Sequence, residues 1–458
     1  SETVPWDPDT DDDGIEDGPE LEWWINDGCA MWNYDYDGDG SRNNLWDADS
    51  EGDGVEDGPE MNGFISWVDA IEHRFYSDPR KYNSDGDSLS DYQEHCSYGT
   101  NPQSMDTDGD TMFDCWEVLY SLNPRLSSDA NLDPDGDGLT NVEEFQVGTH
   151  PSQWDTDGDR MSDGYEYNYG VAAGGWQDPT IYNGRYAILW GGTMGSGEQY
   201  DAFWNDIYDT HRALVENYNW DPEDIYVFYK DAAGCTMNGI DIYGYSTYDS
   251  LAPFLRTDQT TPPIFMVRET ITSNDLIFFM EADHGNTNNF GGQIAWQGQL
   301  ANWFSQHPSH CHNYSYARLV MVLASCHSGS YFNHVFDTPN CIAMSSSRAE
   351  ETSVTWKPLN SNVFGDADDH MEALWNDENN GFVYALTGSN MENPISVFDM
   401  YSSMYEAALD DEFNGGENPF TNKPDWSHAQ IDDTNMDNVP HELPSLGDDG
   451  NLAQTTYL

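Results

Sequence analysis

The sequence has very few basic residues. Lys and Arg together number 15 in 458 residues, against 84 Asp and Glu, which gives a formal net charge of −69 at pH 7. A surface this acidic repels nucleic acid and anionic membranes, so we expect neither as a partner. Salt screens such self-repulsion beyond about 10 Å. The composition is therefore typical of a protein that works in a saline, halophilic-like medium.

Long hydrophobic runs are also missing. No stretch approaches the roughly 20 apolar residues that cross a bilayer, so we expect no membrane span. The sequence starts at Ser1 without Met or a signal peptide, as a processed mature protein would. Six cysteines remain besides Cys326, an even number that permits disulfides without fixing their pairing. Together with the acidic motifs described next, this favours an extracellular location, secreted or at the cell surface.

One acidic motif fills the first part of the chain. It places a carboxylate or amide at positions 1, 3 and 5, often Gly at 6, Asp or Asn at 9, and usually Glu at 12. This spacing can wrap six to eight hard oxygens around one Ca²⁺ ion. We therefore predict several Ca²⁺ ions and no organic cofactor. The predicted ligands are Asp9, Asp11, Asp13, Asp17 and Glu20; Asp35, Asp37, Asp39 and Asn43; Asp49, Glu51, Asp53, Asp57 and Glu60; Asn83, Asp85, Asp87, Asp91 and Glu94; Asp106, Asp108, Asp110, Asp114 and Glu117; Asp133, Asp135, Asp137, Asn141 and Glu144; and Asp155, Asp157, Asp159, Asp163 and Glu166.

Two further regularities accompany these seven loops. A short motif ending in Pro recurs between them, as in Thr100-Asn101-Pro102, and position 7 of most loops is apolar, which predicts a thin core. Repeats at this spacing indicate an array of units that contact their neighbours. Over about residues 7–170 the pattern resembles thrombospondin type 3 repeats, which implies a calcium-dependent, extracellular, mainly structural region; we assign residues 1–179 to it. The alternative, a disordered acidic linker, does not explain the regular spacing.

Metal binding and folding should be a single event in such loops, because closely spaced carboxylates repel one another without cations. We therefore expect chelation of calcium to collapse residues 1–170 and to leave the second part of the chain largely folded. Circular dichroism and limited proteolysis, with and without calcium, test this expectation.

The pattern changes to an α/β type at Arg185. Apolar runs predict strands over 185–190, 225–229, 275–282, 318–325 and 341–345, and helical spacing predicts helices over 198–217 and near 300–304, 366–375 and 397–409. Strands that alternate with helices form a mostly parallel sheet covered by helices on both faces. We assign residues 180–445 to this domain and residues 446–458 to a polar C-terminal tail.

A His motif and a Cys motif follow two of the predicted strands. Asp283-His284-Gly285 comes after residues 276–282, and Ser325-Cys326-His327-Ser328-Gly329 comes after residues 319–324. The carboxyl ends of parallel strands meet at one edge of a sheet, where open α/β folds hold their sites. A thiol attacks as thiolate and needs a nearby base, which His supplies at neutral pH. The backbone N–H of Gly285 can face a developing oxyanion.

The order and spacing of these motifs over roughly residues 183–410 resemble the caspase-like cysteine peptidases, closest to the legumain family. The resemblance implies that Cys326 is the nucleophile, that His284 is the acid/base, and that the N–H groups of Gly285 and Cys326 form the oxyanion hole. It also implies a substrate cleft; its predicted substrate-binding residues are Ser345, Ser346, Ser347, Glu351 and, as a nearby acid, Asp201.

Two positions depart from the family pattern. Ala324 stands two residues before the Cys, where the family has an acid that shapes the pocket, and Ala202 or Phe203 stands where an Arg is expected. The residue preferred before the cut is therefore left open. We expect a secreted calcium-binding cysteine endopeptidase that acts on proteins or peptides, with possible self-assembly or cell-surface attachment through the repeats. The alternative is an inert peptidase-like domain in a calcium-dependent structural, adhesive or filament-forming protein.

Overall fold

The structure is a computed structural model that divides into two compact units, residues 1–154 and 155–458. It describes residues 8–26, 47–172, 175–191, 198–230, 236–255, 271–282, 285–286, 289–290, 295–296, 316–324, 340–345, 389–391, 394, 396–397, 399, 402, 430–432, 456 and 458. The last acidic loop, which begins at Asp155, falls in the second unit with the α/β domain, whereas the sequence placed it with the repeats.

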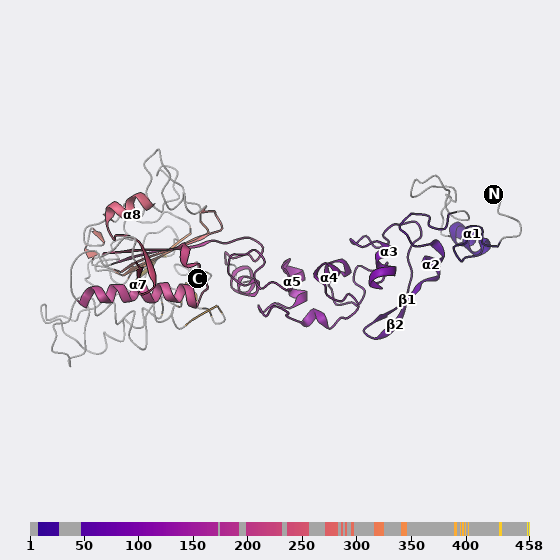
Figure 1. Cartoon of the computed structure of the whole chain (residues 1–458), viewed down its shortest axis with the longest axis horizontal. Coiled ribbons are helices and arrows are strands. Elements are labelled where there is room, and N and C mark those ends of the chain that lie inside the picture. Colours follow the sequence, from indigo (N-terminus) through magenta and orange to yellow (C-terminus); the bar gives the residue numbers. More distant parts are fainter. Residues whose placement is uncertain are drawn as a thin grey trace. The chain divides into compact units, whose positions relative to one another are not determined.

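The described part of the first unit consists mainly of acidic loops, each with a short helix (Figure 1). We name each loop by its first residue, so the Asp106 loop spans residues 106–117. The last four positions of each described loop are helical, because the helix begins at position 9 of the loop. The elements are α1 Asp17–Asn26, α2 Asp57–Asn62, α3 Asp91–Gln93 with the π-turn η1 Glu94–Tyr98, α4 Asp114–Tyr120, the 3₁₀ turn η2 Asp129–Asn131 and α5 Asn141–Val147. An antiparallel hairpin, β1 Phe64–Val68 and β2 Ile71–Phe75, interrupts the array and was not predicted.

The core of the first unit comes from position 7 of the loops, as predicted. The side chains at this position in the described loops are all buried; in this unit they are Ile15, Val55, Leu89, Met112 and Leu139. Backbone hydrogen bonds close each loop across its base. The N–H of Asp114 donates to the carbonyl of Met105 at 2.8 Å, and the N–H of Asp57 donates to Ala48 at 2.7 Å. Acidic residues in the first turn of each helix also suit its partial positive charge.

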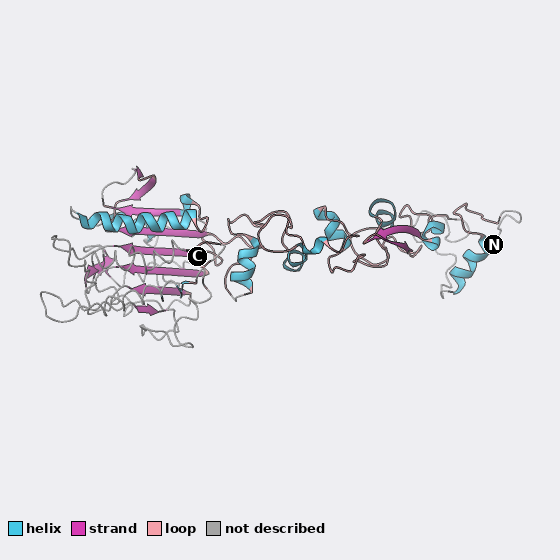
Figure 2. Ribbon diagram, turned by 90° about the horizontal axis from the view of Figure 1, so that it is seen from below, coloured by secondary structure: helices cyan, strands magenta, loops and turns pink. Residues whose placement is uncertain are grey.

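The second unit is built on an eight-stranded sheet in the order β13-β12-β11-β7-β3-β4-β6-β5. Figure 2 shows its strands in magenta. The six inner strands are parallel, and β5 and β13 pair antiparallel at the two edges. The strands are β3 Arg185–Gly191, β4 Ile225–Tyr229, β5 Thr236–Met237, β6 Ile240–Gly244, β7 Leu276–Ala282, β11 Arg318–Ala324, β12 Cys341–Ser345 and β13 Gln430–Asp432; β8 Gly285–Asn286, β9 Asn289–Phe290 and β10 Ala295–Trp296 form a small second sheet.

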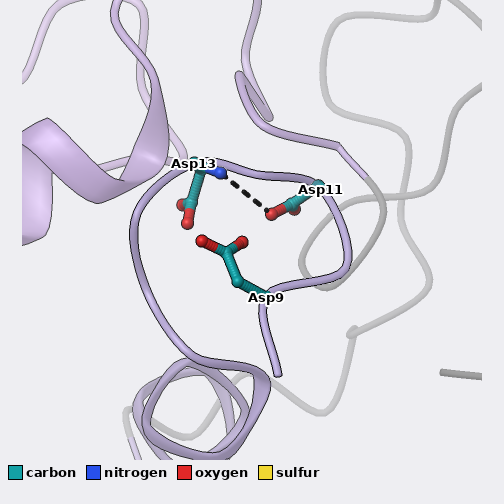
Figure 3. Close-up of side chains that lie close together, drawn as sticks. All are labelled: Asp9, Asp11 and Asp13. Carbon is teal, nitrogen blue, oxygen red and sulfur yellow. Dashed lines mark hydrogen bonds between the residues drawn. The ribbon is translucent and has the colours of Figure 1, made fainter. Parts of the chain in front are cut away.

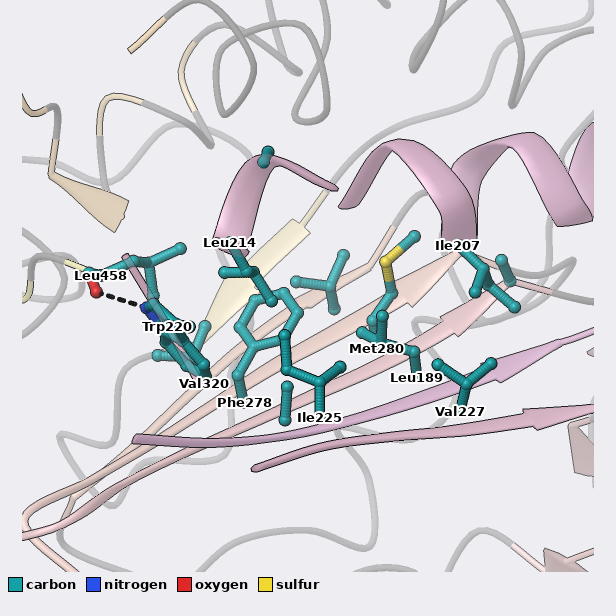
Figure 4. Packing of buried hydrophobic residues seen from close by; sticks show 14 of the residues in the cluster. Leu189, Ile207, Leu214, Trp220, Ile225, Val227, Phe278, Met280, Val320 and Leu458 are labelled. Carbon is teal, nitrogen blue, oxygen red and sulfur yellow. Dashed lines mark hydrogen bonds between the residues drawn. The ribbon is translucent and has the colours of Figure 1, made fainter. Parts of the chain in front are cut away.

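Helices cover both faces of the large sheet, as the alternation of elements predicted (Figure 1). The helix α7 Glu198–Glu216 packs through Ile207 on one face, where Phe278 of β7 lies (Figure 4). The helix α8 Tyr248–Leu255 packs through Phe254 on the other face, where Phe279 lies. Successive residues of β7 point to opposite faces. The central strands are therefore mainly apolar on both faces, and the unit is a mixed α/β fold with a mostly parallel sheet. The other described helices of this unit are α6 Asp163–Tyr165, η3 Glu166–Val171 and η4 Pro222–Asp224.

The predicted strands match the structure within one residue at either end. The predicted helices near 300–304 and 366–375 lie outside the described residues, as does most of 397–409. Thr456 and Leu458, which the sequence assigned to a polar tail, are buried in the second unit, and the Leu458 side chain belongs to its core. Among the described residues, no helix is long and apolar enough to cross a membrane. The described cysteines, Cys96, Cys115 and Cys341, form no disulfide.

Candidate functional sites

The Asp106 loop shows how the acidic motif directs its oxygens. Asp106 accepts hydrogen bonds from the N–H groups of Gly109 at 2.7 Å and Thr111 at 3.0 Å, which fixes the turn. Asp108 and Asp110 each accept one backbone N–H through Oδ1, at 3.2 and 2.9 Å. The Oδ2 atoms of both are buried and have no hydrogen-bond partner within the described structure. Positions 3 and 5 thus keep one oxygen each for a ligand.

Glu117, at position 12 of the same loop, adds two more such oxygens. Its side chain is fully buried, and neither Oε atom has a hydrogen-bond partner among the described residues. Ligand atoms of the acidic side chains converge to within 4.8 Å of one another in several loops, as Figure 3 shows for the first group. These groups include Asp9, Asp11 and Asp13; Asp49, Glu51 and Asp53; Glu51, Asp57 and Glu60; Asp85, Asp87 and Glu94; and Asp106, Asp108 and Asp110.

Burial and mutual repulsion make these carboxyl groups poor anions on their own. Desolvation, followed by the charges of Asp110 and Asp108, raises the pKa of Glu117 to about 9. Desolvation and the charge of Asp110 raise the pKa of Asp108 to about 7. A cation placed among the oxygens would remove the repulsion and favour the charged forms. A dense set of carboxylate oxygens in a flexible loop is the donor set that Ca²⁺ prefers, so these residues fit calcium.

Position 9, where we predicted a metal ligand, also closes the loop. Both oxygens of Asp114 accept hydrogen bonds from Thr107 at position 2: the N–H donates at 2.9 Å and the hydroxyl at 2.7 Å. The described loops with Asp at position 9 all repeat this contact; the pairs are Thr10–Asp17, Ser50–Asp57, Ser84–Asp91, Thr107–Asp114 and Thr156–Asp163. These aspartates therefore take part in loop closure, and Asp57 also belongs to one of the acidic groups named above.

The sequence holds the signal for this pairing. A hydroxyl at position 2 always accompanies Asp at position 9, whereas the Asp133 loop has Pro134 and Asn141 at these places. The Asp35 loop likewise has Tyr36 and Asn43, although its predicted ligands, Asp35, Asp37, Asp39 and Asn43, lie outside the described residues.

Asp129 is a candidate ligand that sequence reasoning missed. It lies outside the twelve-residue spacing, in η2, and its side chain is 7% exposed. Its Oδ2 accepts the N–H of Asn123 at 3.0 Å, while Oδ1 has no hydrogen-bond partner in the described part of the chain. Its charge contributes to the raised pKa values of Glu117 and Asp110. Asp129 therefore adds a carboxylate to the Asp106 loop.

The second candidate site lies at the carboxyl edge of the large sheet. Ala282, the last residue of β7, pairs in register with Ala324, the last residue of β11. Next to them, Ser345 at the end of β12 pairs with Leu323. Gly285 begins β8, and Asp201 lies in α7. The other predicted site residues, Cys326, His284, Ser346, Ser347 and Glu351, lie outside the described residues.

The register of β7 and β11 bears directly on the predicted dyad. His284 comes two residues after Ala282, and Cys326 comes two residues after Ala324. The chain therefore leaves the sheet toward both residues from directly paired positions on neighbouring parallel strands. This is the edge at which open α/β sheets bind ligands.

Residues 267–379 match the Peptidase C13 family. This part of the chain is similar to the legumain-type cysteine peptidases. The match includes β7, β11, β12 and the positions of His284 and Cys326, so it supports a cysteine peptidase and protein or peptide substrates. A comparison with curated proteins found no match to the chain.

Proposed function

We propose that the chain is a secreted, calcium-binding cysteine endopeptidase that hydrolyses peptide bonds through Cys326 and His284. The pairing of Ala282 with Ala324 carries this proposal, because the two motifs follow these paired residues directly in the sequence. The family match over residues 267–379 supports the same chemistry.

The reaction is an acyl transfer to a thiolate. The Cys326 thiolate attacks the carbonyl carbon of the scissile bond, and the N–H groups of Gly285 and Cys326 stabilise the resulting oxyanion. His284 protonates the leaving amine, and water then hydrolyses the acyl-enzyme with His284 as base. Ser345, Ser346, Ser347, Glu351 and Asp201 line the substrate cleft in this proposal.

The acidic loops bind Ca²⁺ in this proposal. Buried, unpaired oxygens of residues such as Glu117 support it, since such groups are costly without a cation. Millimolar extracellular calcium suits loops of this kind, which agrees with the proposed location outside the cell. The loop array would space the peptidase from a surface or partner, to which it attaches through its repeats.

Cleavage of a mixed peptide library tests the peptidase. Wild type and Cys326→Ala are incubated in parallel in salt and millimolar calcium, and products are identified by mass spectrometry. Cuts made only by wild type are expected, and their sequences give the preferred residue before the cut. Cuts of equal number by both proteins would contradict the assignment of Cys326.

The second candidate is an inert peptidase-like domain in a calcium-dependent structural or filament-forming protein. Ala324 favours it, because a small apolar residue replaces the acid that shapes the pocket in the family. Calcium-dependent assembly of folded protein without any turnover, followed by light scattering, would support this candidate over the peptidase.

A further inference from the structure

Arg185, the first residue of β3, is a buried cation at the amino edge of the large sheet. Its side chain is 4% exposed. The guanidinium donates to the backbone oxygens of Tyr218 at 3.0 Å, Leu458 at 3.3 Å and Asp159 at 3.5 Å. It also lies 5.5 Å from the ring centre of Trp220. A guanidinium taken out of water is tolerated only where anions compensate for the lost hydration.

The Asp155 loop supplies this negative charge. Asp159, Glu166 and Asp155 all favour the charged form of Arg185. Asp159, at position 5 of the loop, also accepts the N–H of Asn183 through Oδ2 at 2.9 Å. A predicted calcium ligand is thus hydrogen-bonded to the segment that leads directly into β3.

Arg160, at position 6 of the Asp155 loop, also contacts the α/β unit. Nη2 of Arg160 lies 2.7 Å from Oδ2 of Asp221, which precedes β4. The side-chain amide of Asn219 donates to the Arg160 carbonyl at 3.1 Å. Two adjacent residues of the loop, Asp159 and Arg160, therefore contact the segments that lead into β3 and β4.

Glu166, at position 12, is a buried acid whose charge Arg185 compensates only in part. It is fully buried, and neither Oε atom has a hydrogen-bond partner among the described residues. Asp159, Asp157 and Asp163 add further negative charge close to it. Arg185 offsets only one of these negative charges, and an added divalent cation would offset two more.

We propose that the Asp155 loop is a divalent-cation site belonging to the α/β unit, and that the bound ion is required for the amino edge of the large sheet to be stably folded. The inference rests on the proposed binding of calcium by the loops. Without the ion, the carboxylates repel one another, and the bonds of Asp159 to Asn183 and Arg185 transmit the loss to β3. The α/β unit therefore depends on calcium, contrary to the expectation that chelation would spare it.

The ion would act through folding, because its loop and the strand ends that precede the proposed catalytic residues lie at opposite ends of the strands. β3 has seven residues, so its two edges are about 20 Å apart at roughly 3.3 Å per residue. The Asp155 loop lies at the amino edge, and Cys326 follows the carboxyl edge.

Hydrogen exchange of the full chain, read by mass spectrometry, tests the inference. Glu166→Gln is compared with Glu117→Gln, the same change at position 12 of a loop in the first unit, and calorimetry counts the calcium ions that each protein binds. We expect each variant to lose one ion. Exchange in β3 and β4 should rise by about tenfold or more in Glu166→Gln alone. In wild type, protection of β3 should increase with calcium together with that of residues 155–166.

The outcomes separate this inference from the proposal on which it rests. If each variant loses an ion while β3 and β4 keep their wild-type exchange, the inference is overturned and calcium binding by the loops stands. If neither variant loses an ion, calcium binding at these loops is itself overturned. If the Glu166→Gln chain does not fold, the wild-type protein alone still tests the inference. Hydrogen-exchange protection of β3 that does not change with calcium concentration would then overturn it.

Discussion

The hydroxyl of Thr107 lies 2.7 Å from Oδ2 of Asp114 and donates a hydrogen bond to it. The same hydroxyl oxygen accepts the N–H of Asn101 at 2.7 Å. One side chain therefore ties the Asn-Pro motif before the loop to the first turn of α4 after it. The corresponding Ser84 makes both contacts in its own loop, with Asp78 and Asp91. The two repeats seen in the sequence are thus parts of one structural unit.

Replacing Thr107 with Val should destabilise the first unit by about 2 kcal/mol, because the buried Asp114 carboxylate loses a hydrogen bond. Thr107→Ser keeps the hydroxyl and is the matched control, with an expected loss well below that of Val. Urea unfolding in saturating calcium measures both. Equal losses for Val and Ser would show that the hydroxyl is not what closes the loop.

Thr111, at position 6 of the Asp106 loop, has φ +85°, a conformation unfavourable for a β-branched residue. Thr111→Gly should therefore stabilise the first unit by about 1 kcal/mol. The converse change is Gly109→Ala, at φ +83° with open space around the added methyl group. It should destabilise the unit by a similar amount through backbone strain alone. A Thr111→Gly protein that is less stable than wild type would contradict this reading of the loop.

Asp129→Asn should lower the calcium affinity of one site by roughly tenfold, since it removes a carboxylate that supports the Asp106 loop. Calcium titration by calorimetry measures the affected site. Glu72→Gln removes one negative charge from the hairpin strand β2, where the side chain is exposed, and controls for the overall charge. The same loss of affinity in both variants would reduce the effect to net charge.

The sequence predicted the regular parts of this fold well because their signals are local. Apolar runs located β4 and β12 at their observed bounds, and position 7 of the loops located the thin core. The hairpin β1–β2 was missed because its strand β2 has three consecutive exposed polar residues, 72–74, and only its last residue, Phe75, is buried. The strands β5 and β13 were missed because each is only two or three residues long and exists through pairing at a sheet edge.

Long-range contacts explain the remaining differences. Spacing alone identified the acidic positions but could not show that Asp114 is engaged by Thr107, or that Asp129 reaches the Asp106 loop from another turn. The Asp155 loop contacts β3 through Arg185, thirty residues after the start of the loop. The sequence of β3 is otherwise that of a buried strand and gives no sign of this contact. Such partners are set by tertiary packing, which a twelve-residue pattern does not contain.

His211 of α7 makes the stability of the α/β unit depend on pH. Burial lowers its pKa to about 4, whereas an unfolded His titrates near 6.5. Between these values the unfolded chain binds more protons, so this group's contribution is full above about pH 6.5 and is lost as the pH falls toward 4. In His211→Gln, the loss of stability between pH 7 and pH 4.5, measured by urea unfolding, should be smaller than in wild type. An identical loss would contradict the assignment.

The most direct test of the central claim is the reactivity of Cys326. A thiol paired with His284 should be largely thiolate at pH 6 and should react with iodoacetamide there. Cys96 is the internal reference, because it is exposed and therefore accessible to the reagent. Its pKa is raised by partial desolvation and by the charge of Asp53, so it should be mostly protonated at pH 6. Mass spectrometry should find Cys326 labelled much faster than Cys96 in wild type, and this advantage lost in His284→Ala. Labelling of Cys326 no faster than Cys96, in folded wild type, would contradict the proposed dyad.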